Sequence, residues 1–499
     1  MRRFILNLLG ALTPLVIGAS GSCTEETARA FATELQSSLS ENARIIFPES
    51  VDFSNATVRW STYGQPTFAV VVEVATEDDV SETVKFANAY ALPFLATSGH
   101  HGAIKTLAGV NCGVNIYLRK LNKVEVQADG QTAIIQGGIY TREVTDALWE
   151  VGKWTVTGVC ECTSLMGPAL GGGHGWNQGR YGLGLDQFVE VNLVLGDGSS
   201  ITVSDDSNPE LFWALRGAGH NFGIITSVRY RIYDVPKDNT WTVATYKYTQ
   251  DKLESVFGLL NEFTAGGEQP IELRYWADFL RDASVDPANA SILLFLVYEG
   301  TEDQASPYTS QLVALGPATV SSQPTDYPGI AQLTLNGKNQ GSCTYSDTHR
   351  LRFPIGIRSF NLTAQRKAFN LFNNVTQTYP GLNGSVFLNE GYSVKAVQQI
   401  PPDSTAYPER FNNLLLSANF RNAPDPFLDQ VATEAGLAIR AILLEGTGSS
   451  EMNTYVNYVV GEETLEDWYG HEEWRIAKLR ALKSKYDPDH KFSFYAPIQ

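Results

Sequence analysis

The chain has 499 residues, of which 43% are hydrophobic and 18% charged, and its formal net charge is −17. This length predicts roughly two or three domains, each large enough to bury a core. A protein that binds nucleic acid or an anionic membrane carries a basic face, and no segment here gathers Lys and Arg in that way. We interpret the acidity as a solvated surface and expect neither partner.

Residues 1–21 have the pattern of a secretory signal. Arg2 and Arg3 precede an apolar run over 4–19, and small residues at 19–21 offer a cleavage site. A membrane anchor is the alternative, but the run is short for a membrane span and Pro14 interrupts it. Five N-x-Ser/Thr sequons agree with export: Asn55, Asn289, Asn361, Asn374 and Asn383. We therefore expect a secreted, N-glycosylated protein without a membrane segment after cleavage.

The stretch up to residue 235 alternates short strands, helices and glycine-rich loops. A strand is predicted over 67–74, and Thr76 with Asp79 predicts the capping box of a helix that follows. Asp197-Gly198 predicts a hairpin turn. Further strands are predicted over 133–136, 189–195 and 201–203. This mixture favours an α+β fold.

The glycine-rich punctuation stops near residue 236, and we place a second domain over 236–450. Strands are predicted over 241–248 and 291–298, with an amphipathic helix over 251–263 between them. A last helix, which carries Ile476 and Leu479, is predicted to end at Asp487-Pro488.

Three loops have the composition of a cofactor site. The first is Thr97-Ser98-Gly99-His100-His101-Gly102, where small residues let backbone N–H groups approach a pyrophosphate. The second runs from Gly158 through Gly167 to the triplet Gly171–Gly173, and we hypothesise that a cofactor occupies the space that side chains would fill. A tight structural turn is the alternative for the triplet. The third loop, over 217–223, leads from a helix into a strand.

The five cysteines are Cys23, Cys112, Cys160, Cys162 and Cys343. Export favours disulfides, and the odd number leaves at least one sulfur free or in chemical use. A Cys160–Cys162 disulfide would be strained, and the other pairings stay open. The cysteines with His101 and His174 fit no common zinc pattern, so we expect no metal.

The order S-G-x-H-G, G-V-C…G-G-G-H-G and N-P-x-L-F-W-A-L-R-G-x-G…N-F-G-I-x-T over residues 60–232 resembles the vanillyl-alcohol-oxidase-type flavoproteins, in their berberine-bridge-enzyme-like branch. Tyr455–Tyr458 and the stretches over 468–470 and 485–489 fit the same family. The resemblance implies a p-cresol-methylhydroxylase-type FAD domain in two parts, 22–235 and 451–499. It also implies a substrate domain over 236–450, whose antiparallel sheet, covered by helices, lies over the flavin ring.

The resemblance further implies FAD bound through two covalent links. His101 would bond the flavin 8α carbon and Cys160 would bond C6. His100 replaces a usual glycine, and Glu161 replaces a usual proline. Other positions implied to contact the cofactor are Thr97, Ser98, Gly99, His100, Gly102, Gly167, Gly171, Gly172, Gly175, Asn221, Gly223, Ile224 and Asn457.

Four residues are candidates for proton transfer, and each has a structural alternative. Glu390 falls close to the acidic base of relatives, although an ordinary exposed Glu is the alternative. Tyr455 and Tyr458 match the Y-x-x-Y element beside the flavin, on a segment that we interpret as a strand, and aromatic core residues are the alternative. His174 could relay a proton as a neutral imidazole or only pack.

The function implied is a secreted, FAD-linked oxidase that takes a hydride from a small molecule and passes electrons to O₂, giving H₂O₂. We favour a hydrophobic secondary metabolite or alcohol as substrate. An oligosaccharide or carbohydrate is the alternative, and Tyr275, Trp276 and Phe279 are candidates to line either groove. A non-catalytic flavin-binding or ligand-binding protein is the alternative of another class. We expect a monomer.

Overall fold

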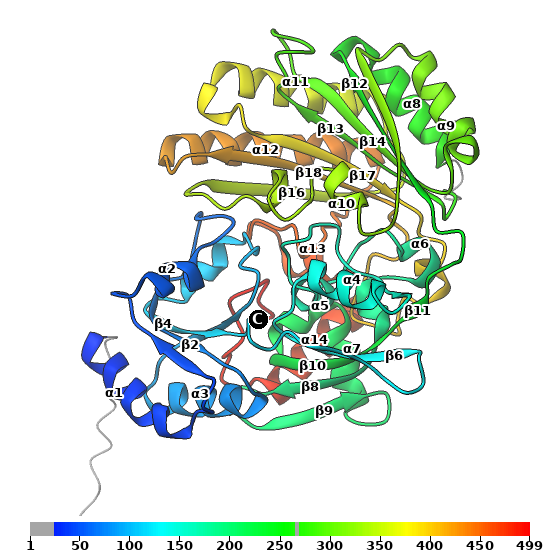
Figure 1. The fold of residues 1–499 in the computed structure, drawn as a ribbon. Helices are drawn as coiled ribbons and strands as arrows, with labels where there is room; N and C mark the ends of the chain where they lie inside the picture. Colours follow the sequence, from blue (N-terminus) through cyan, green and yellow to red (C-terminus); the bar gives the residue numbers. More distant parts are fainter. Residues whose placement is uncertain (1–23, 265–268) are drawn as a thin grey trace, which may run out of the picture.

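The computed structural model describes residues 24–264 and 269–499, so the predicted signal at 1–21 lies outside the described residues. The chain forms two lobes (Figure 1). The upper lobe in that view holds a seven-stranded sheet and its helices, and the lower lobe holds a four-stranded and a five-stranded sheet. This architecture confirms the predicted α+β class and the antiparallel sheet covered by helices.

The four-stranded sheet of the lower lobe has the order β1-β2-β4-β3, in which β2, β4 and β3 run parallel and β1 is antiparallel to β2. Helices α1 and α3 pack against it. The predicted capping box at the start of α3 is confirmed, since the Thr76 side chain accepts a hydrogen bond from the Asp79 backbone N–H. The elements are α1 (Glu25–Leu35), β1 (Arg44–Ile46), α2 (Val51–Thr57), β2 (Phe68–Glu73), α3 (Glu77–Ala89), β3 (Phe94–Thr97) and β4 (Gly113–Tyr117).

The five-stranded sheet is antiparallel, in the order β5-β6-β10-β8-β9. Three of its strands confirm the sequence prediction, and Gly198 has a φ of +85° in the predicted hairpin turn, a conformation that glycine adopts readily. Its elements are β5 (Val124–Val126), β6 (Thr132–Gln136), α4 (Thr141–Trp149), α5 (Met166–Leu170), α6 (Gln178–Tyr181), β8 (Phe188–Val194), β9 (Ser200–Ser204), α7 (Pro209–Ala218) and β10 (Ile224–Arg231). A ribbon of β7 (Lys153–Trp154) and β11 (Tyr233–Asp234) follows.

The end of the chain returns to the lower lobe. Helices α13 (Leu465–Tyr469) and α14 (Glu473–Tyr486) lie there, shown in red in Figure 1. Leu479 and Ile498 pack in the same hydrophobic cluster as Phe212 and Ile225. Residues far apart in the sequence therefore share one core.

The upper lobe has a seven-stranded antiparallel sheet in the order β15-β12-β14-β13-β17-β18-β16. Four helices cover its outer face, and its other face looks toward the lower lobe (Figure 1). The strands are β12 (Trp241–Tyr248), β13 (Leu273–Leu280), β14 (Ser291–Glu299), β15 (Thr319–Thr325), β16 (His349–Ile357), β17 (Val386–Tyr392) and β18 (Leu414–Asn422). The helices are α8 (Leu253–Phe263), α9 (Glu302–Ala314), α11 (Leu362–Thr378) and α12 (Pro426–Thr447).

Alternation along β13 decides which aromatic side chains reach the space between the lobes. Trp276 faces the lower lobe, where its ring lies 4.8 Å from that of Trp176. Tyr275 and Phe279 point the other way, into the core under the helices, and Phe279 packs edge-on against Phe369 of α11. Of the three aromatic residues proposed for the groove, only Trp276 faces it.

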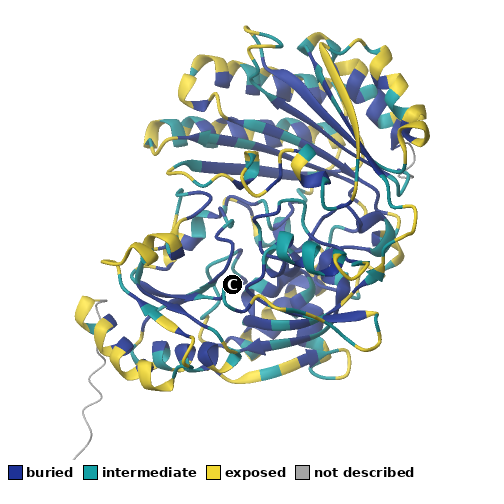
Figure 2. Ribbon diagram, viewed as in Figure 1, coloured by how far each residue is buried: buried dark blue, intermediate teal, exposed yellow. Residues whose placement is uncertain are grey.

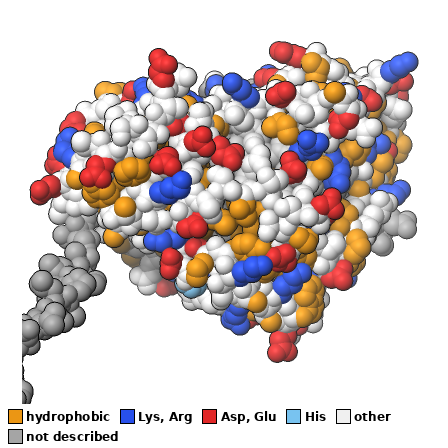
Figure 3. Space-filling view, turned by 90° about the horizontal axis from the view of Figure 1, so that it is seen from below, with side chains coloured by type: hydrophobic (Ala, Val, Ile, Leu, Met, Phe, Trp, Pro, Cys, Tyr) orange, Lys and Arg blue, Asp and Glu red, His pale blue; other side chains and the backbone are white. Residues whose placement is uncertain are grey.

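Burial follows these layers. The inner strands of the three main sheets are largely buried, whereas the edge strand β15 is exposed, and exposed residues also gather on the outer faces of the helices (Figure 2). Acidic and basic side chains are interspersed on the face drawn in Figure 3. Within residues 24–264 and 269–499, no helix is both long and apolar enough to cross a membrane.

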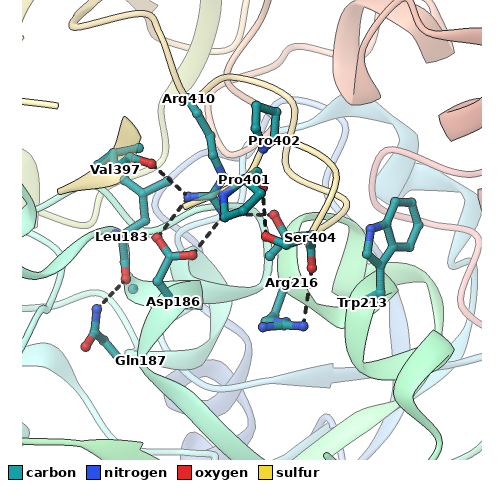
Figure 4. A network of polar contacts seen from close by, with 12 residues as sticks. Leu183, Asp186, Gln187, Trp213, Arg216, Val397, Pro401, Pro402, Ser404 and Arg410 are labelled. Carbon is teal, nitrogen blue, oxygen red and sulfur yellow. Dashed lines mark hydrogen bonds and ion pairs between the residues drawn. The ribbon is translucent and has the colours of Figure 1, made fainter. Parts of the chain in front are cut away.

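A buried ion pair joins the lobes (Figure 4). Arg410, on the loop before β18, donates through both Nη atoms to the Asp186 carboxylate, at 3.1 and 2.9 Å. The two side chains are 0% and 3% exposed. The Leu183 backbone N–H donates to the same carboxylate at 2.8 Å. Both carboxylate oxygens and both Nη atoms are therefore hydrogen-bonded, while Arg410 Nε is buried without a partner.

We expect Asp186→Asn to destabilise the protein by about 3–5 kcal/mol, because it leaves the Arg410 guanidinium buried without a counter-charge. Denaturant unfolding at neutral pH measures this. The matched control is Glu25→Gln, which removes an exposed partner of Arg29 and should cost less than about 1 kcal/mol. Equal effects of the two substitutions would contradict the role given to the buried pair.

Candidate active site

A cavity of about 550 Å³ lies between the lobes. Its floor and walls come from the loops of the lower lobe, and its roof is the inner face of the seven-stranded sheet. Eleven of the residues assigned to the cofactor line it: Thr97, Ser98, Gly99, His100, His101, Gly102, Cys160, Gly167, Gly223, Ile224 and Asn457. The four candidates for proton transfer line it too. Residues from loops more than 300 positions apart therefore meet at one space.

His101 is held by an aromatic stack and one hydrogen bond. Its ring stacks on Trp60 with 4.4 Å between centroids. Its Nε2 lies 3.0 Å from the Ser342 carbonyl oxygen. Because a carbonyl only accepts, Nε2 must carry the proton, which leaves Nδ1 with a free lone pair. Burial lowers the pKa of His101 to about 3, so the imidazole is neutral at physiological pH.

His100 points away from its neighbour. Its Nε2 lies 2.9 Å from the Thr97 hydroxyl oxygen, and its ring stacks on Tyr117. Its backbone has a φ of +50°, in the left-handed region that favours glycine. This conformation accounts physically for the glycine that is usual at this position.

Cys160 is covered by a segment of the upper lobe, residues 334–345, which we call the cap loop. The Cys160 thiol lies 3.1 Å from the Asn336 side-chain oxygen and 3.4 Å from the Ser342 hydroxyl. Burial raises the pKa of the thiol to about 11. Ser342 therefore contacts both His101 and Cys160.

A disulfide and the residue next to Cys160 anchor the cap loop to the lower lobe. Cys162 is bonded to Cys343 across 181 positions of the chain. The Glu161 backbone N–H donates to the Asn336 carbonyl at 3.0 Å, and its carboxylate accepts from the Lys338 backbone N–H at 2.7 Å. A proline at position 161 has no N–H to donate, so the departure from the family pattern has a structural role. The sequence alone left this disulfide unassigned; Cys160 is free, and Cys112 is in a disulfide.

The glycine triplet is packed against protein. Gly171, Gly172 and Gly175 do not line the cavity. A Cβ on Gly171 would lie 2.5 Å from the Asn457 side-chain oxygen, and one on Gly175 would lie 1.8 Å from the Thr157 carbonyl oxygen. Close packing of the chain, the alternative weighed above, is thus sufficient to require these glycines, and their contact with a cofactor stays a prediction.

Asn221 also lies away from the cavity. Its side chain donates to the Tyr469 hydroxyl and the Ala496 carbonyl and accepts from the Ile498 backbone N–H. It fastens the returning end of the chain to the lower lobe. Its assignment to the cofactor stays a prediction as well.

Glu390 is buried on β17, in the roof of the cavity. The Tyr392 hydroxyl donates to one carboxylate oxygen at 2.9 Å, and the Tyr458 hydroxyl donates to the other at 3.1 Å. Burial raises the pKa of Glu390 above its ordinary value, while the two tyrosine hydroxyls and the Arg352 charge lower it. A carboxylate so placed can accept a proton from a group in the cavity.

Tyr455 and Tyr458 lie on a turn, and the predicted strand was wrong. The Tyr458 backbone N–H donates to the Tyr455 carbonyl at 2.8 Å, which brings the two rings to 5.0 Å. On a strand, residues three apart would point to opposite faces. Asn457 between them donates to the Tyr455 hydroxyl at 2.7 Å and still lines the cavity.

His174 is buried between two partners. Its Nδ1 lies 2.9 Å from the Gln178 side-chain oxygen, and its Nε2 lies 3.0 Å from the Tyr407 hydroxyl. Burial lowers its pKa to about 4, which keeps it neutral. Both nitrogens are engaged within the protein, which favours the packing role over the relay of a proton.

Several cavity residues were missed by sequence reasoning. On the roof they include Asp278, Arg350 and Arg352, which belong to strands and carry no local motif. The alternation of Arg350 and Arg352 along β16 was the available signal, because residues two apart on a strand share a face. Asp278 lies on the same face of β13 as Trp276, and burial raises its pKa well above the ordinary value.

Comparison with known proteins adds the following. A family model described as an FAD binding domain matches residues 68–204. The chain is 41% identical over 467 residues to the FAD-linked oxidoreductase chyH of Penicillium rubens, covering 93% of each protein. It is 39% identical over 462 residues to the FAD-linked oxidoreductase anuG of Penicillium roqueforti, covering 92% of this chain and 90% of that protein.

Two solved structures share the fold. Physcomitrella patens BBE-like 1 superposes with a TM-score of 0.77 at 21% identity, covering 94% of this chain and 99% of that one. Glucooligosaccharide oxidase from Acremonium strictum superposes with a TM-score of 0.78 at 19% identity, covering 95% and 99%. At these identities the likeness concerns the fold alone.

The buried, neutral His100 should make stability depend on pH. Burial lowers the pKa of His100 in the folded state to about 3, whereas the unfolded value is about 6.5. The contribution of this neutral histidine to the free energy of unfolding is therefore complete above about pH 6.5 and is lost as the pH falls. Between pH 7 and pH 5 the loss is about 2 kcal/mol for this residue. We expect His100→Asn to remove this part of the pH-dependent loss of stability, because asparagine tolerates the left-handed backbone and does not titrate in this range.

Urea unfolding at the two pH values measures the difference. The matched control is His490→Asn, which makes the same substitution at an exposed histidine with a φ of +53°. The same loss of stability in wild type and in His100→Asn would contradict the expectation.

Proposed function

The chain belongs to the FAD-linked oxidoreductases, in the berberine-bridge-enzyme-like branch of the vanillyl-alcohol-oxidase flavoproteins, and on that premise we propose that it is a secreted oxidase with a bicovalently attached flavin. It is an FAD-dependent oxidoreductase. In this proposal it removes a hydride from a small hydrophobic metabolite or alcohol and passes the electrons to O₂, releasing H₂O₂.

The observation that carries the proposal is the meeting of His101 and Cys160 at one wall of the cavity, where Ser342 contacts both. A histidine can form a carbon–nitrogen bond only through a nitrogen with a free lone pair, and the Ser342 carbonyl leaves Nδ1 in that state. The solved glucooligosaccharide oxidase is described with a 6-S-cysteinyl, 8α-N1-histidyl FAD. The two side chains here thus fit the same pair of links.

When bound, FAD supplies the hydride acceptor. The protein supplies the proton acceptor, and Glu390 is the residue that we propose for it, with Tyr458 next to the substrate as relay. Tyr392 and Tyr458 hold the two carboxylate oxygens in fixed directions. Tyr455 and His174 lie behind them, where Tyr455 accepts hydrogen bonds from Asn457 and from the Gly173 backbone N–H.

The second candidate is an oxidase of oligosaccharides, because a solved structure with this fold is a glucooligosaccharide oxidase. Peroxide release across a panel of sugars, alcohols and aromatic metabolites separates the two. Export is supported by the sequons, of which Asn55, Asn361, Asn374 and Asn383 are exposed. Asn289 is half-buried and donates to Asp286.

Acid denaturation tests the covalent links. We expect flavin to stay with the denatured chain in wild type, in His101→Ala and in Cys160→Ala, and to be released from the double variant, because either bond alone holds it. Absorbance of the precipitated chain measures the retained flavin, and His490→Asn, at an exposed histidine that does not line the cavity, is the control. Release of free flavin from wild type would contradict covalent attachment.

The pH profile tests Glu390. Its pKa is raised by burial, so the deprotonated, active form should be lost as the pH falls through a value above the ordinary 4.3 of glutamate. We expect Glu390→Gln to lower kcat by about 10²–10⁴-fold and to abolish this acidic limb. Its flavin absorbance should be unchanged.

Glu434→Gln, at an exposed position on α12, is the matched control. Unchanged kcat and an unchanged acidic limb in Glu390→Gln would exclude this residue as the base and leave the flavin assignment standing.

A further inference from the structure

Arg352 is a buried cation without a hydrogen-bond or carboxylate partner among the described residues. Its side chain lies on the inner face of β16 and lines the cavity. Its guanidinium stacks over the Tyr458 ring at 3.6 Å and lies 5.4 Å from the Trp60 ring. Among the described residues, no hydrogen bond or ion pair holds the guanidinium, and Nε is buried without an acceptor. Because the side chain lines the cavity, a ligand there can reach the guanidinium.

Two further arginines lie beside it. Arg350 shares the face of β16 and lies 4.2 Å from the Trp60 ring. It donates to the Thr344 carbonyl and has no carboxylate partner among the described residues. Burial, with the charges of Arg421 and Arg352, lowers its pKa to about 10. Arg421 lines the same side of the roof.

The buried arginines of the described chain divide into two groups. Those away from the cavity are each paired with a carboxylate: Arg274 with Glu299, Arg410 with Asp186, Arg440 with Glu463 and Arg475 with Glu472. Those that line the cavity are Arg59, Arg350 and Arg352, and none of them is paired. A buried charge is costly unless it is paired, so the cavity group is expected to meet its anion from outside the chain.

The balance of charge points the same way. The protein carries a net charge of −17, yet the cavity is lined by four arginines and two acids, Asp278 and Glu390. Burial favours the neutral form of both acids. The roof is therefore cationic within an acidic protein.

We propose that Arg352, supported by Arg350, binds the carboxylate of an aromatic acid, so that the substrates of this enzyme are carboxylate-bearing aromatic metabolites. The planar fork of a guanidinium matches a carboxylate, and Val386 and Leu388, which alternate along β17 with Glu390 on the cavity face, offer apolar contacts to the attached ring. The inference rests on the proposed function for its substrate role. The fixed negative charge of FAD is on its pyrophosphate, which the ribityl chain separates from the flavin edge that His101 and Cys160 would bond. Arg350 and Arg352 lie beside Trp60, on which His101 stacks, so the proposal assigns their anion to the substrate.

The position of the site sets the size of the substrate. Arg352 covers the ring of Tyr458, and the hydroxyl of that ring donates to Glu390. The anion site and the proton acceptor are thus separated by about one aromatic ring. The reacting bond is expected to lie that far from the carboxylate.

Calorimetric titration of the purified, flavin-loaded protein with benzoate and with benzamide tests the site. We expect wild type to bind benzoate and to bind benzamide far more weakly. Arg352→Met should weaken benzoate binding roughly 10- to 100-fold, the effect of losing a charge-assisted hydrogen bond, and leave benzamide unchanged. Arg352→Lys keeps the charge and should lose less. Arg358→Met, at an exposed arginine just beyond the end of β16, should bind benzoate like wild type.

Thermal unfolding of each variant shows whether it is folded. If Arg352→Met does not fold, the comparison of wild type with Arg352→Lys tests the proposal. Equal benzoate affinity in wild type and in the Arg352 variants overturns the proposal, as does equal affinity for benzamide or no binding of benzoate by wild type. A purified protein without flavin overturns the proposed function instead, and the same titration still decides the anion site. Peroxide released only from neutral substrates would support the proposed oxidase function and contradict the proposed preference for carboxylate-bearing substrates.

Discussion

Exclusion of water from the space beneath the seven-stranded sheet controls the chemistry of the ionisable side chains there. Desolvation is the largest influence on His101, Cys160 and Glu390, and it favours the neutral form of each. A neutral imidazole and a carboxyl with a raised pKa are the forms needed for bond formation and for accepting a proton near neutral pH. The thiol is the exception, because a pKa of about 11 opposes formation of the thiolate, the nucleophilic form. Of the two proposed links, the one at Cys160 is therefore the harder to form, and His101 is the better candidate for the first bond.

The enclosed space exists because polar ties hold the lobes together. The Arg410–Asp186 pair closes one side of the interface, and the Cys162–Cys343 disulfide closes the side near the proposed flavin links. The disulfide joins a residue two positions from Cys160 to one next to Ser342, so it fixes the contacts of Cys160 as well as the cap loop itself. Glu161 adds the hydrogen bonds that a proline at that position would not form. Glu161 and Cys162, the two residues that follow Cys160, thus both hold the cap loop against the lower lobe.

Sequence reasoning succeeded where the information was local. The capping box at Thr76, the strands with regular alternation and the glycine-rich loops depend on neighbouring residues. It failed where a contact depended on register or on distant pairing. The disulfide spans 181 positions, and the turn that brings Tyr455 to Tyr458 has no glycine or proline to reveal it. The sequence indicated the roof residues only through alternation along strands. Nothing in it distinguished Arg352 from other strand residues, because its neighbours in the cavity come from distant segments. Glu390 was found because it lay close to a family position, although its two tyrosine partners came from the fold.

Arg352 and Glu390 are coupled, and the coupling works in favour of the reaction proposed. The charge of Arg352 lowers the pKa of Glu390, while burial raises it. A carboxylate bound to the guanidinium would cancel part of that charge and so raise the pKa of Glu390. The base would become stronger once the substrate is in place, and by linkage a protonated Glu390 would bind the anion more tightly. Tyr458 stands between them, stacked under the cation and hydrogen-bonded to the acid, so it can transmit proton and charge together. An anion site one ring away from the base is therefore also a means of setting the strength of that base.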